Sequence, residues 1–180
     1  MESHEHLRLF VALLLPDDAV ARLVDWQRNE LVGRGDFRLV PPENLHITMA
    51  FLGRTPSERL LDIAQATREA AQKVEPPVLE PVRYRETRSV GMIVLSDEGG
   101  RAERLASRVF RRLERLGIYE REQRRWLPHV TVIRFRERPR LQPPPPELGR
   151  VTSSEMAVMM SRLAPTGAQY EVLESVSLGG

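Results

Sequence analysis

Two short segments of this 180-residue chain repeat one pattern, a histidine and a threonine separated by a single apolar residue. They are residues 45–49 (LHITM) and 128–132 (PHVTV), and they contain two of the chain's four histidines, His46 and His129. Successive side chains of a β-strand point to opposite faces, so each histidine shares a face with its threonine while the apolar residues fill the other face. The pattern therefore predicts two half-buried strands, each presenting an imidazole beside a hydroxyl.

Apolar periodicity and turn residues divide the rest of the chain into helices and strands. Helices are expected at 19–32, 55–74 and 101–116, and the second is expected to open with a capping box at residues 55–58 (TPSE). Strands are expected at 7–15, 45–52, 78–87, 90–95, 127–135, 151–163 and 169–178. Each repeated segment then lies on a strand that follows a helix. This order predicts two similar α+β lobes, each presenting one motif, within a single domain of residues 1–180.

Composition narrows the possible chemistry. The chain has no cysteine, which excludes disulfides, thiolate metal ligands and a cysteine nucleophile, and we expect a cytoplasmic protein. Residues 1–6 are polar, and the apolar run at 7–15 is short and contains Arg8. We therefore expect neither a signal peptide nor a membrane span.

Basic residues are unevenly distributed along the chain. The formal net charge is only +2, yet all basic residues except Lys73 are arginines. Residues 120–140 contain seven arginines and three glutamates, and they surround the second motif. A local excess of positive charge favours an anionic ligand there.

Two imidazoles that face one cleft are suited to acid–base catalysis. A single histidine on a strand is more often structural, but a repeated one can supply both a base and an acid, because imidazole titrates near neutral pH. The neighbouring threonine hydroxyls can donate hydrogen bonds to phosphate oxygens or another oxyanion.

Metal and nucleotide-cofactor sites find little support in the sequence. Each motif offers only one metal ligand, and the His-x-His spacing of His4 and His6 falls on a polar segment that we interpret as an N-terminal tail. The chain contains no glycine-rich phosphate loop, Rossmann fingerprint or nucleophile elbow. We expect no metal and no cofactor.

Four stretches carry a resemblance to a known family: residues 8–13 (RLFVAL), 40–53 (VPPENLHITMAFLG), 128–134 (PHVTVIR) and 161–173 (SRLAPTGAQYEVL). In these stretches the chain resembles the two-histidine phosphoesterase superfamily, and within it the RNA 2′,3′-cyclic phosphodiesterases, also called 2′-5′ RNA ligases. The resemblance implies a bilobal α+β fold with two pseudo-symmetric antiparallel-sheet lobes, helices on the outer faces and a central cleft. It also implies metal-independent hydrolysis of an RNA 2′,3′-cyclic phosphate to a 2′-phosphate, with 2′-5′ ligation as a related reaction. We expect a monomer that acts on RNA with a cyclic phosphate end or on a small nucleotide.

The resemblance also implies roles for individual residues. His46, Thr48, His129 and Thr131 correspond to the catalytic set, with His129 as the base and His46 as the acid. Phe51 and Arg134 correspond to contacts with the terminal nucleotide and the phosphate. Each lies five residues after its histidine, so it can face the cleft only if its strand twists, bulges or ends there.

Two other functions remain open from the sequence. The first is a non-catalytic module that binds RNA ends or nucleotides. The second is a related phosphodiesterase that acts on 2′-5′ oligonucleotides or small cyclic nucleotides.

Overall fold

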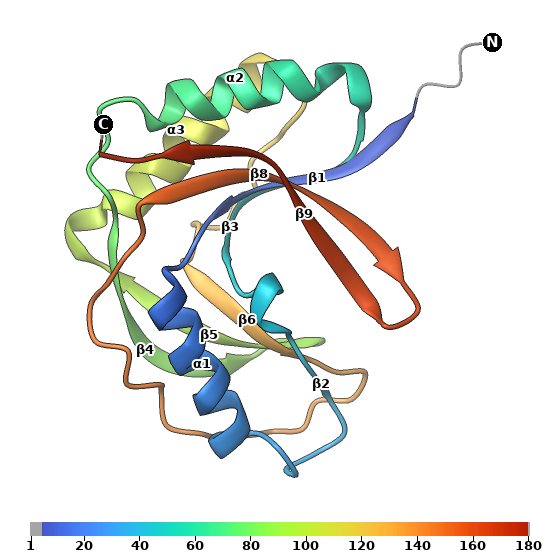
Figure 1. The fold of residues 1–180 in the computed structure, drawn as a ribbon, viewed down its shortest axis with the longest axis vertical. Coiled ribbons are helices and arrows are strands. Elements are labelled where there is room, and N and C mark those ends of the chain that lie inside the picture. The colour runs from blue at the N-terminus through green and yellow to red at the C-terminus, as the bar shows by residue number, and fades with distance from the viewer. Residues whose placement is uncertain (1–4, 180) are drawn as a thin grey trace.

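The computed structural model describes residues 5–179 and consists of strands and helices, and residues 135–150 form the longest segment that connects two of them (Figure 1). Three short 3-10 turns cover Pro42–Asn44, Ser57–Arg59 and Glu98–Gly100. In chain order, the helices and strands are β1 (His6–Leu13), α1 (Asp17–Glu30), β2 (Arg38–Leu39), β3 (Ile47–Pro56), α2 (Leu60–Ala71), β4 (Val78–Glu86), β5 (Val90–Asp97), α3 (Arg101–Arg115), β6 (His129–Arg134), β7 (Val151–Thr152), β8 (Glu155–Ala164) and β9 (Gly167–Ser177).

The strands of the described chain form one curled antiparallel sheet in the order β7-β4-β5-β6-β3-β1-β8-β9, and β2 also pairs with β6. The two central strands, β3 and β6, are joined by only one residue pair, Ile47 and Val130. The sheet is therefore two halves that meet at this pair, and each half contributes one motif strand. This arrangement confirms the predicted α+β class, and the two lobes are halves of one continuous sheet.

Helices cover the outer faces of both halves (Figure 1). Helix α1 lies over the β4–β6 half, where the ring of Trp26 lies 6.3 Å from that of Tyr84. Helices α2 and α3 pack against each other, and they also contact the β3-β1-β8-β9 half. No helix within residues 5–179 is long and apolar enough to cross a membrane.

Strand β1 separates two apolar clusters. Leu9, Val11 and Leu13 are fully buried in the main core between the sheet and the helices. Phe10 and Ala12 point to the opposite, inner face and join a second cluster with Ala157 and Met159. Of this second cluster, Phe10 lines the cavity described below.

The predicted capping box at residues 55–58 is wrong. Thr55 pairs with Leu7 in the β1–β3 ladder, so β3 continues through Gly53 to Pro56. The Thr55 hydroxyl donates to the carbonyl of Gly53 instead of capping a helix. Ladder pairing thus occupies the first two residues of the predicted box, and the 3-10 turn Ser57–Arg59 leads into helix α2, which begins at Leu60.

The strand predicted at 151–163 is broken in the structure. Its first part, β7, pairs with β4, whereas β8 pairs with β1 and β9 in the other half of the sheet. The break is at Ser153, which is fully buried. Its backbone N–H donates to Pro77 and its hydroxyl donates to Leu14. The chain thus crosses between the halves at a serine whose polar groups are satisfied on both sides.

Two further differences concern short segments. Strand β2, with only two residues, lies where the sequence predicts a loop, and it pairs with the end of β6. The interpretation of His6 as a tail residue is wrong, because His6 opens β1 opposite Pro56. His4 lies outside the described residues.

Candidate functional site

A β-bulge in β6 brings Arg134 to the same face of the strand as His129 and Thr131. The pairing with β5 advances by two residues in β6, from Thr131 to Ile133, where β5 advances by one, so Val132 is the extra residue. Val132 and Ile133 are consecutive and both fully buried. A bulge reverses the alternation of the following side chains, which places Arg134 toward the cleft.

Strand β3 has the same construction. Its pairing with β1 skips Met49 and then Leu52, so two bulges follow the first motif. Met49 and Ala50 are consecutive and both buried, and Phe51 therefore turns back toward the cleft, where its side chain is half exposed. His46 lies immediately before β3, which begins at Ile47 and not at the predicted residue 45. In both motifs, the histidine, the threonine two residues later and the residue five later line the same cavity.

The faces of both strands meet at one cavity of about 310 Å³ between the two halves of the sheet. All six site residues predicted from the sequence line this cavity: His46, Thr48, Phe51, His129, Thr131 and Arg134. The structure thus brings together residues that are as far as 88 positions apart in the sequence. None of the six lies in the main core.

The two motif strands meet at a single residue pair. Ile47 lies opposite Val130 in an antiparallel pair. His46 and His129 lie on either side of this pair and both line the cavity, so they can flank one ligand group.

The ring of His46 is oriented by hydrogen bonds at both nitrogens. Its Nδ1 lies 2.8 Å from the backbone carbonyl oxygen of Asn44. A carbonyl only accepts, so Nδ1 carries the proton. Its Nε2 lies 2.9 Å from Oγ1 of Thr48, and in the neutral ring it accepts that hydroxyl proton. The ring centroid is 5.0 Å from that of Phe10 and 5.4 Å from that of Tyr170, so aromatic surface surrounds the imidazole.

Burial lowers the pKa of His46 from 6.5 to about 4, although the hydrogen bond to the carbonyl of Asn44 opposes this change. Electrostatic interaction with Arg134 and with His129 lowers this pKa further. His46 is therefore neutral at pH 7 in the free site. An anionic ligand between these cationic groups would raise its pKa again.

This environment gives a prediction for histidine NMR titration. In the free protein, the His46 ring should remain neutral at pH 7 and titrate near pH 4. Saturation with inorganic phosphate should shift the titration upward. In a Tyr170→Ala variant the pKa should rise toward 6.5, because water reaches the ring. A His46 titration near 6.5 in the unaltered free protein would contradict this account of the site.

His129 has one ring nitrogen free for chemistry. Its Nδ1 donates to the carbonyl oxygen of Leu127 at 2.8 Å. Its Nε2 makes no hydrogen bond with any residue of the 5–179 segment. Because Nδ1 carries the proton, Nε2 of the neutral ring has an available lone pair. His129 can therefore accept a proton from a group in the cavity.

Three arginines line the same cavity: Arg8, Arg38 and Arg134. The guanidinium of Arg8 lies over the ring of Phe51, 4.8 Å from its centroid. Arg38 and Arg134 lie directly opposite each other in the β2–β6 ladder, on the same face. Like charges in that position destabilise a strand pair, and an anion bound between them would relieve the repulsion.

Two supporting residues were missed by the sequence analysis. The side-chain amide of Gln27 donates hydrogen bonds to the carbonyls of Val40 and Val132, at 3.0 and 2.8 Å. It thus provides a donor for the carbonyl of the extra residue in the bulge of β6. Trp126 Nε1 donates to the carbonyl of Thr48 at 3.1 Å, beside the first bulge of β3. Gln27 did carry a signal, because it is a polar residue within the apolar stripe of α1 and is buried.

The residues that the structure describes contain no cluster of three or more histidine, aspartate or glutamate side chains that could hold a metal together. The polar groups at the cavity are instead imidazoles, hydroxyls and guanidiniums. Such a set offers hydrogen-bond donors and proton acceptors to an anionic ligand.

Comparisons with known proteins point to one family. The family model described as LigT like Phosphoesterase matches residues 13–84. An RNA 2′,3′-cyclic phosphodiesterase of Thermus thermophilus is 32% identical, and the alignment covers 97% of this chain and 91% of that one. The enzyme of the same name from Archaeoglobus fulgidus is 31% identical, with 93% and 98% covered.

Solved structures show the same fold. A crystal structure of a Thermus thermophilus protein superposes with a TM-score of 0.81 at 31% sequence identity, covering 97% of this chain and 99% of that one. E. coli LigT in its apo form has a TM-score of 0.80 at 23% identity, with 98% and 99% covered.

Proposed function

This chain belongs to the LigT-like phosphoesterase family, and we propose that it is an RNA 2′,3′-cyclic phosphodiesterase that opens the terminal cyclic phosphate to a 2′-phosphate. The observation that carries the proposal is that the two His-x-Thr motifs line one cavity. Each motif is on or beside a strand with a β-bulge, which turns a further residue toward that cavity. The relatives named RNA 2′,3′-cyclic phosphodiesterase, which align over most of this chain, support it.

In the proposed reaction, neutral His129 removes a proton from water through Nε2 while the water oxygen attacks phosphorus. The bond between phosphorus and the 3′ oxygen breaks as the new bond forms, and His46 as imidazolium gives its proton to the departing 3′ oxygen. Because His46 is neutral in the free site, it must gain this proton when the anionic substrate binds. An RNA 5′-hydroxyl in place of water would give 2′-5′ ligation by the same path.

Hydroxyl and guanidinium groups would stabilise the charge that develops on the phosphate. In the free site the Thr48 hydroxyl donates to Nε2 of His46, and it becomes available to a non-bridging oxygen once His46 is protonated. The Thr131 hydroxyl lines the same cavity and can donate in the same way. Arg134 provides a positive charge on the same face. The half-exposed ring of Phe51 and the exposed side chain of Leu163 offer apolar surface to the terminal base.

The same proposal includes a single functional unit formed by residues 1–180, acting as a monomer in the cytoplasm. Each half of the sheet provides one histidine, so neither half has a complete acid–base pair. The two imidazoles can perform both proton transfers, and we therefore propose that no metal or other cofactor takes part.

Product analysis tests the proposed function. The purified protein should convert an oligoribonucleotide ending in 2′,3′-cyclic phosphate to a product with a 2′-phosphate end, identified by chromatography against 2′- and 3′-phosphate standards. Turnover should be unchanged by a metal chelator. Binding without turnover would favour the non-catalytic module, and cleavage restricted to 2′-5′ oligonucleotides or small cyclic nucleotides would favour the related phosphodiesterase.

A further inference from the structure

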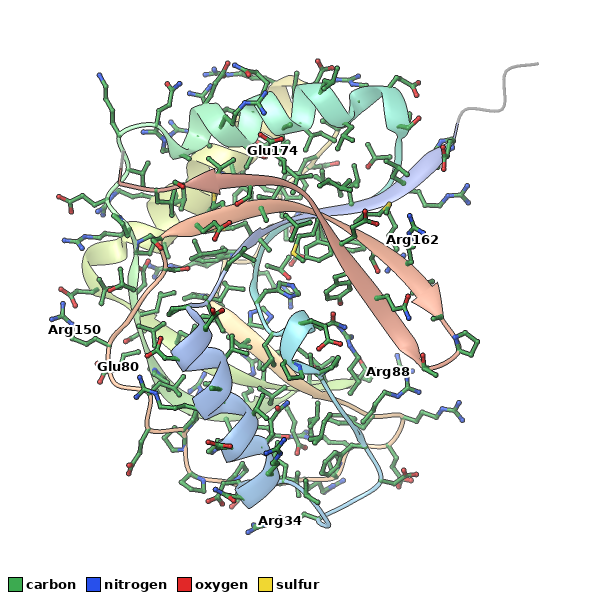
Figure 2. All side chains as sticks on the ribbon, in the orientation of Figure 1. Arg34, Glu80, Arg88, Arg150, Arg162 and Glu174 are labelled. Atoms are coloured by element: carbon green, nitrogen blue, oxygen red, sulfur yellow. The ribbon has the colours of Figure 1, made fainter. Side chains whose placement is uncertain are left out.

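A second, larger hollow of about 1000 Å³ adjoins the cavity, and we call it the arginine groove. One wall is the loop from Arg34 to Arg38, between α1 and β2, and the other is the segment from Arg134 to Pro139 at the end of β6. Figure 2 labels Arg34, which lies just beyond the C-terminal end of α1 and lines this groove. The charged side chains that line the groove are Arg34, Arg38, Arg134, Arg136 and Arg138, with Asp36 and Glu137.

The arginine groove is continuous with the proposed active site. Arg38 and Arg134 line both the groove and the cavity. Neither they nor Arg136 forms an ion pair with a carboxylate within the part of the chain that the structure describes. Arg34 and Arg138 do have partners, Glu30 at 3.9 Å and Glu86 at 3.0 Å. The arginines that line the groove and the cavity therefore outnumber the carboxylates that line them or pair with these arginines.

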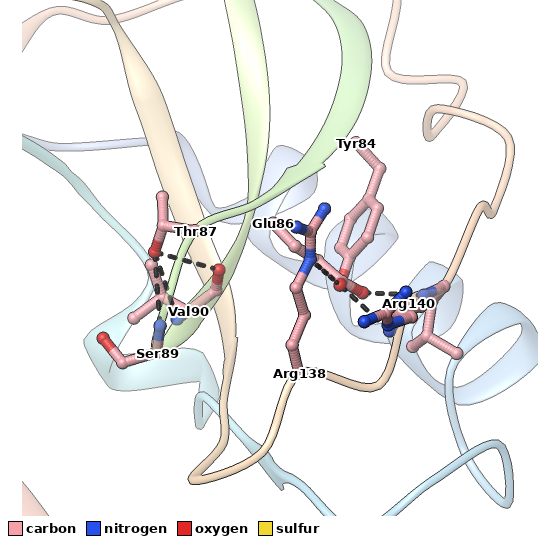
Figure 3. A network of polar contacts seen from close by, with 8 residues as sticks. Tyr84, Glu86, Thr87, Ser89, Val90, Arg138 and Arg140 are labelled. Carbon is pink, nitrogen blue, oxygen red and sulfur yellow. Dashed lines mark hydrogen bonds and ion pairs between the residues drawn. The ribbon is translucent and has the colours of Figure 1, made fainter.

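The second wall of the groove is held in place by a buried carboxylate. Glu86 accepts hydrogen bonds from Nε of Arg138 and from the backbone N–H groups of Arg140 and Leu141, as Figure 3 shows for the two arginines. Tyr84 donates a further hydrogen bond to this carboxylate. These contacts fix the loop that follows β6, so the arginines of this wall are positioned before a ligand binds.

We propose that the arginine groove binds the phosphodiester backbone upstream of the reacting end, so that the preferred substrate is an RNA chain and not a mononucleotide. This inference rests on the proposed function. A cavity of about 310 Å³ is at the small end of ligand pockets and suits one terminal nucleotide. The rest of the RNA chain must leave the cavity. Arg38 and Arg134 line both the cavity and the groove, and they give the exit a positive charge that attracts the negatively charged RNA backbone.

The groove chemistry fits a single RNA strand. Guanidinium groups match phosphate oxygens with two parallel hydrogen bonds, and exposed arginines along a groove can follow a flexible backbone. Three arginines of the groove are exposed and lie outside the cavity, where only a longer substrate would reach them: Arg34, Arg136 and Arg138. Because Arg138 also pairs with Glu86, Arg34 and Arg136 are the two that can be changed without disturbing that contact.

A comparison of two substrates tests this inference. The substrates are 2′,3′-cyclic AMP and a pentaribonucleotide ending in 2′,3′-cyclic phosphate. The variants are Arg34→Gln, Arg136→Gln and the double variant, with Arg111→Gln on the exposed surface of α3 as a charge-matched control. The double variant should lower kcat/KM for the pentanucleotide about 10-fold at low salt, and should leave cyclic AMP hydrolysis unchanged. The control variant should match the unaltered protein with both substrates.

Salt dependence provides an independent readout. Each phosphate contact on a single strand contributes about 0.7 to the slope of log affinity against log salt concentration. The slope for the pentanucleotide should therefore become shallower by about 1.4 in the Arg34→Gln, Arg136→Gln double variant. Unchanged kcat/KM and slope for the pentanucleotide, or equal losses with both substrates, would overturn the inference.

The test separates the groove from the proposed reaction. If the unaltered protein hydrolyses neither substrate, the proposed function fails, and binding of a fluorescent pentaribonucleotide then decides the role of the groove. Weaker, less salt-dependent binding by the double variant would support a backbone site. Identical binding by the double variant and the unaltered protein would reject it.

Discussion

Alanine in place of His46 or His129 should each lower kcat for hydrolysis of a 2′,3′-cyclic phosphate by about 10²–10⁴-fold, the range typical of a lost general acid or base. Either change removes one of the two proton transfers, while the hydroxyls and Arg134 continue to contact the phosphate. KM should therefore change much less than kcat. Steady-state kinetics with 2′,3′-cyclic AMP measure both effects.

The two histidine variants should remain folded. His129 donates a hydrogen bond to the backbone at Leu127, and its side chain is only partly buried. His46 packs against Phe10 and Tyr170, so a His46→Gln variant serves as a control that keeps most of the side-chain volume. Circular dichroism and thermal unfolding check the fold.

The double variant distinguishes a shared reaction from two separate sites. If both histidines act on one phosphate, removing the second should cost much less than removing the first, because residues that act as a unit are non-additive. Full activity in either single variant would exclude the proposed pair. Fully multiplicative losses would contradict a single concerted step.

The positions of the histidines and threonines could be predicted because they depend on local alternation alone. Two residues apart on a strand, a histidine and a threonine share a face whatever the strand pairs with. The order of helices and strands also followed from local periodicity, as the bounds of β4 and α3 illustrate.

Phe51 and Arg134 could not be placed from alternation, because their direction depends on bulges in the ladders. A bulge is set by the pairing of two strands that are distant in the sequence, here β3 with β1 and β6 with β5. The same limitation explains the capping-box error, since Thr55 could have opened a helix had it not paired with Leu7. The split of β7 from β8 likewise follows from partners in different halves of the sheet.

Glu86→Ala should lower the free energy of unfolding by about 2–4 kcal/mol, because four donors lose the buried carboxylate that accepts their hydrogen bonds. The Glu86 side chain is 2% exposed. It accepts from Tyr84, Arg138 and two backbone N–H groups (Figure 3). Urea unfolding at pH 7 measures the change. Glu80→Ala is the matched control, since Glu80 lies exposed on the same strand and its removal should change stability by less than about 0.5 kcal/mol.

The pH dependence of this loss identifies the charge of Glu86 as its cause. Burial alone would raise the pKa of Glu86, but the hydrogen bonds from Leu141, Arg138, Tyr84 and Arg140 lower it below 4.5 in the folded protein. A carboxylate with a lowered pKa stabilises the fold above pH 4.5, and this stabilisation is lost as the pH falls toward the folded-state pKa. The stability difference between the unaltered protein and Glu86→Gln should therefore shrink on acidification below pH 4.5. A difference that stays constant from pH 7 to pH 3 would show that shape and packing, and not the ionised carboxylate, hold the loop after β6 in place.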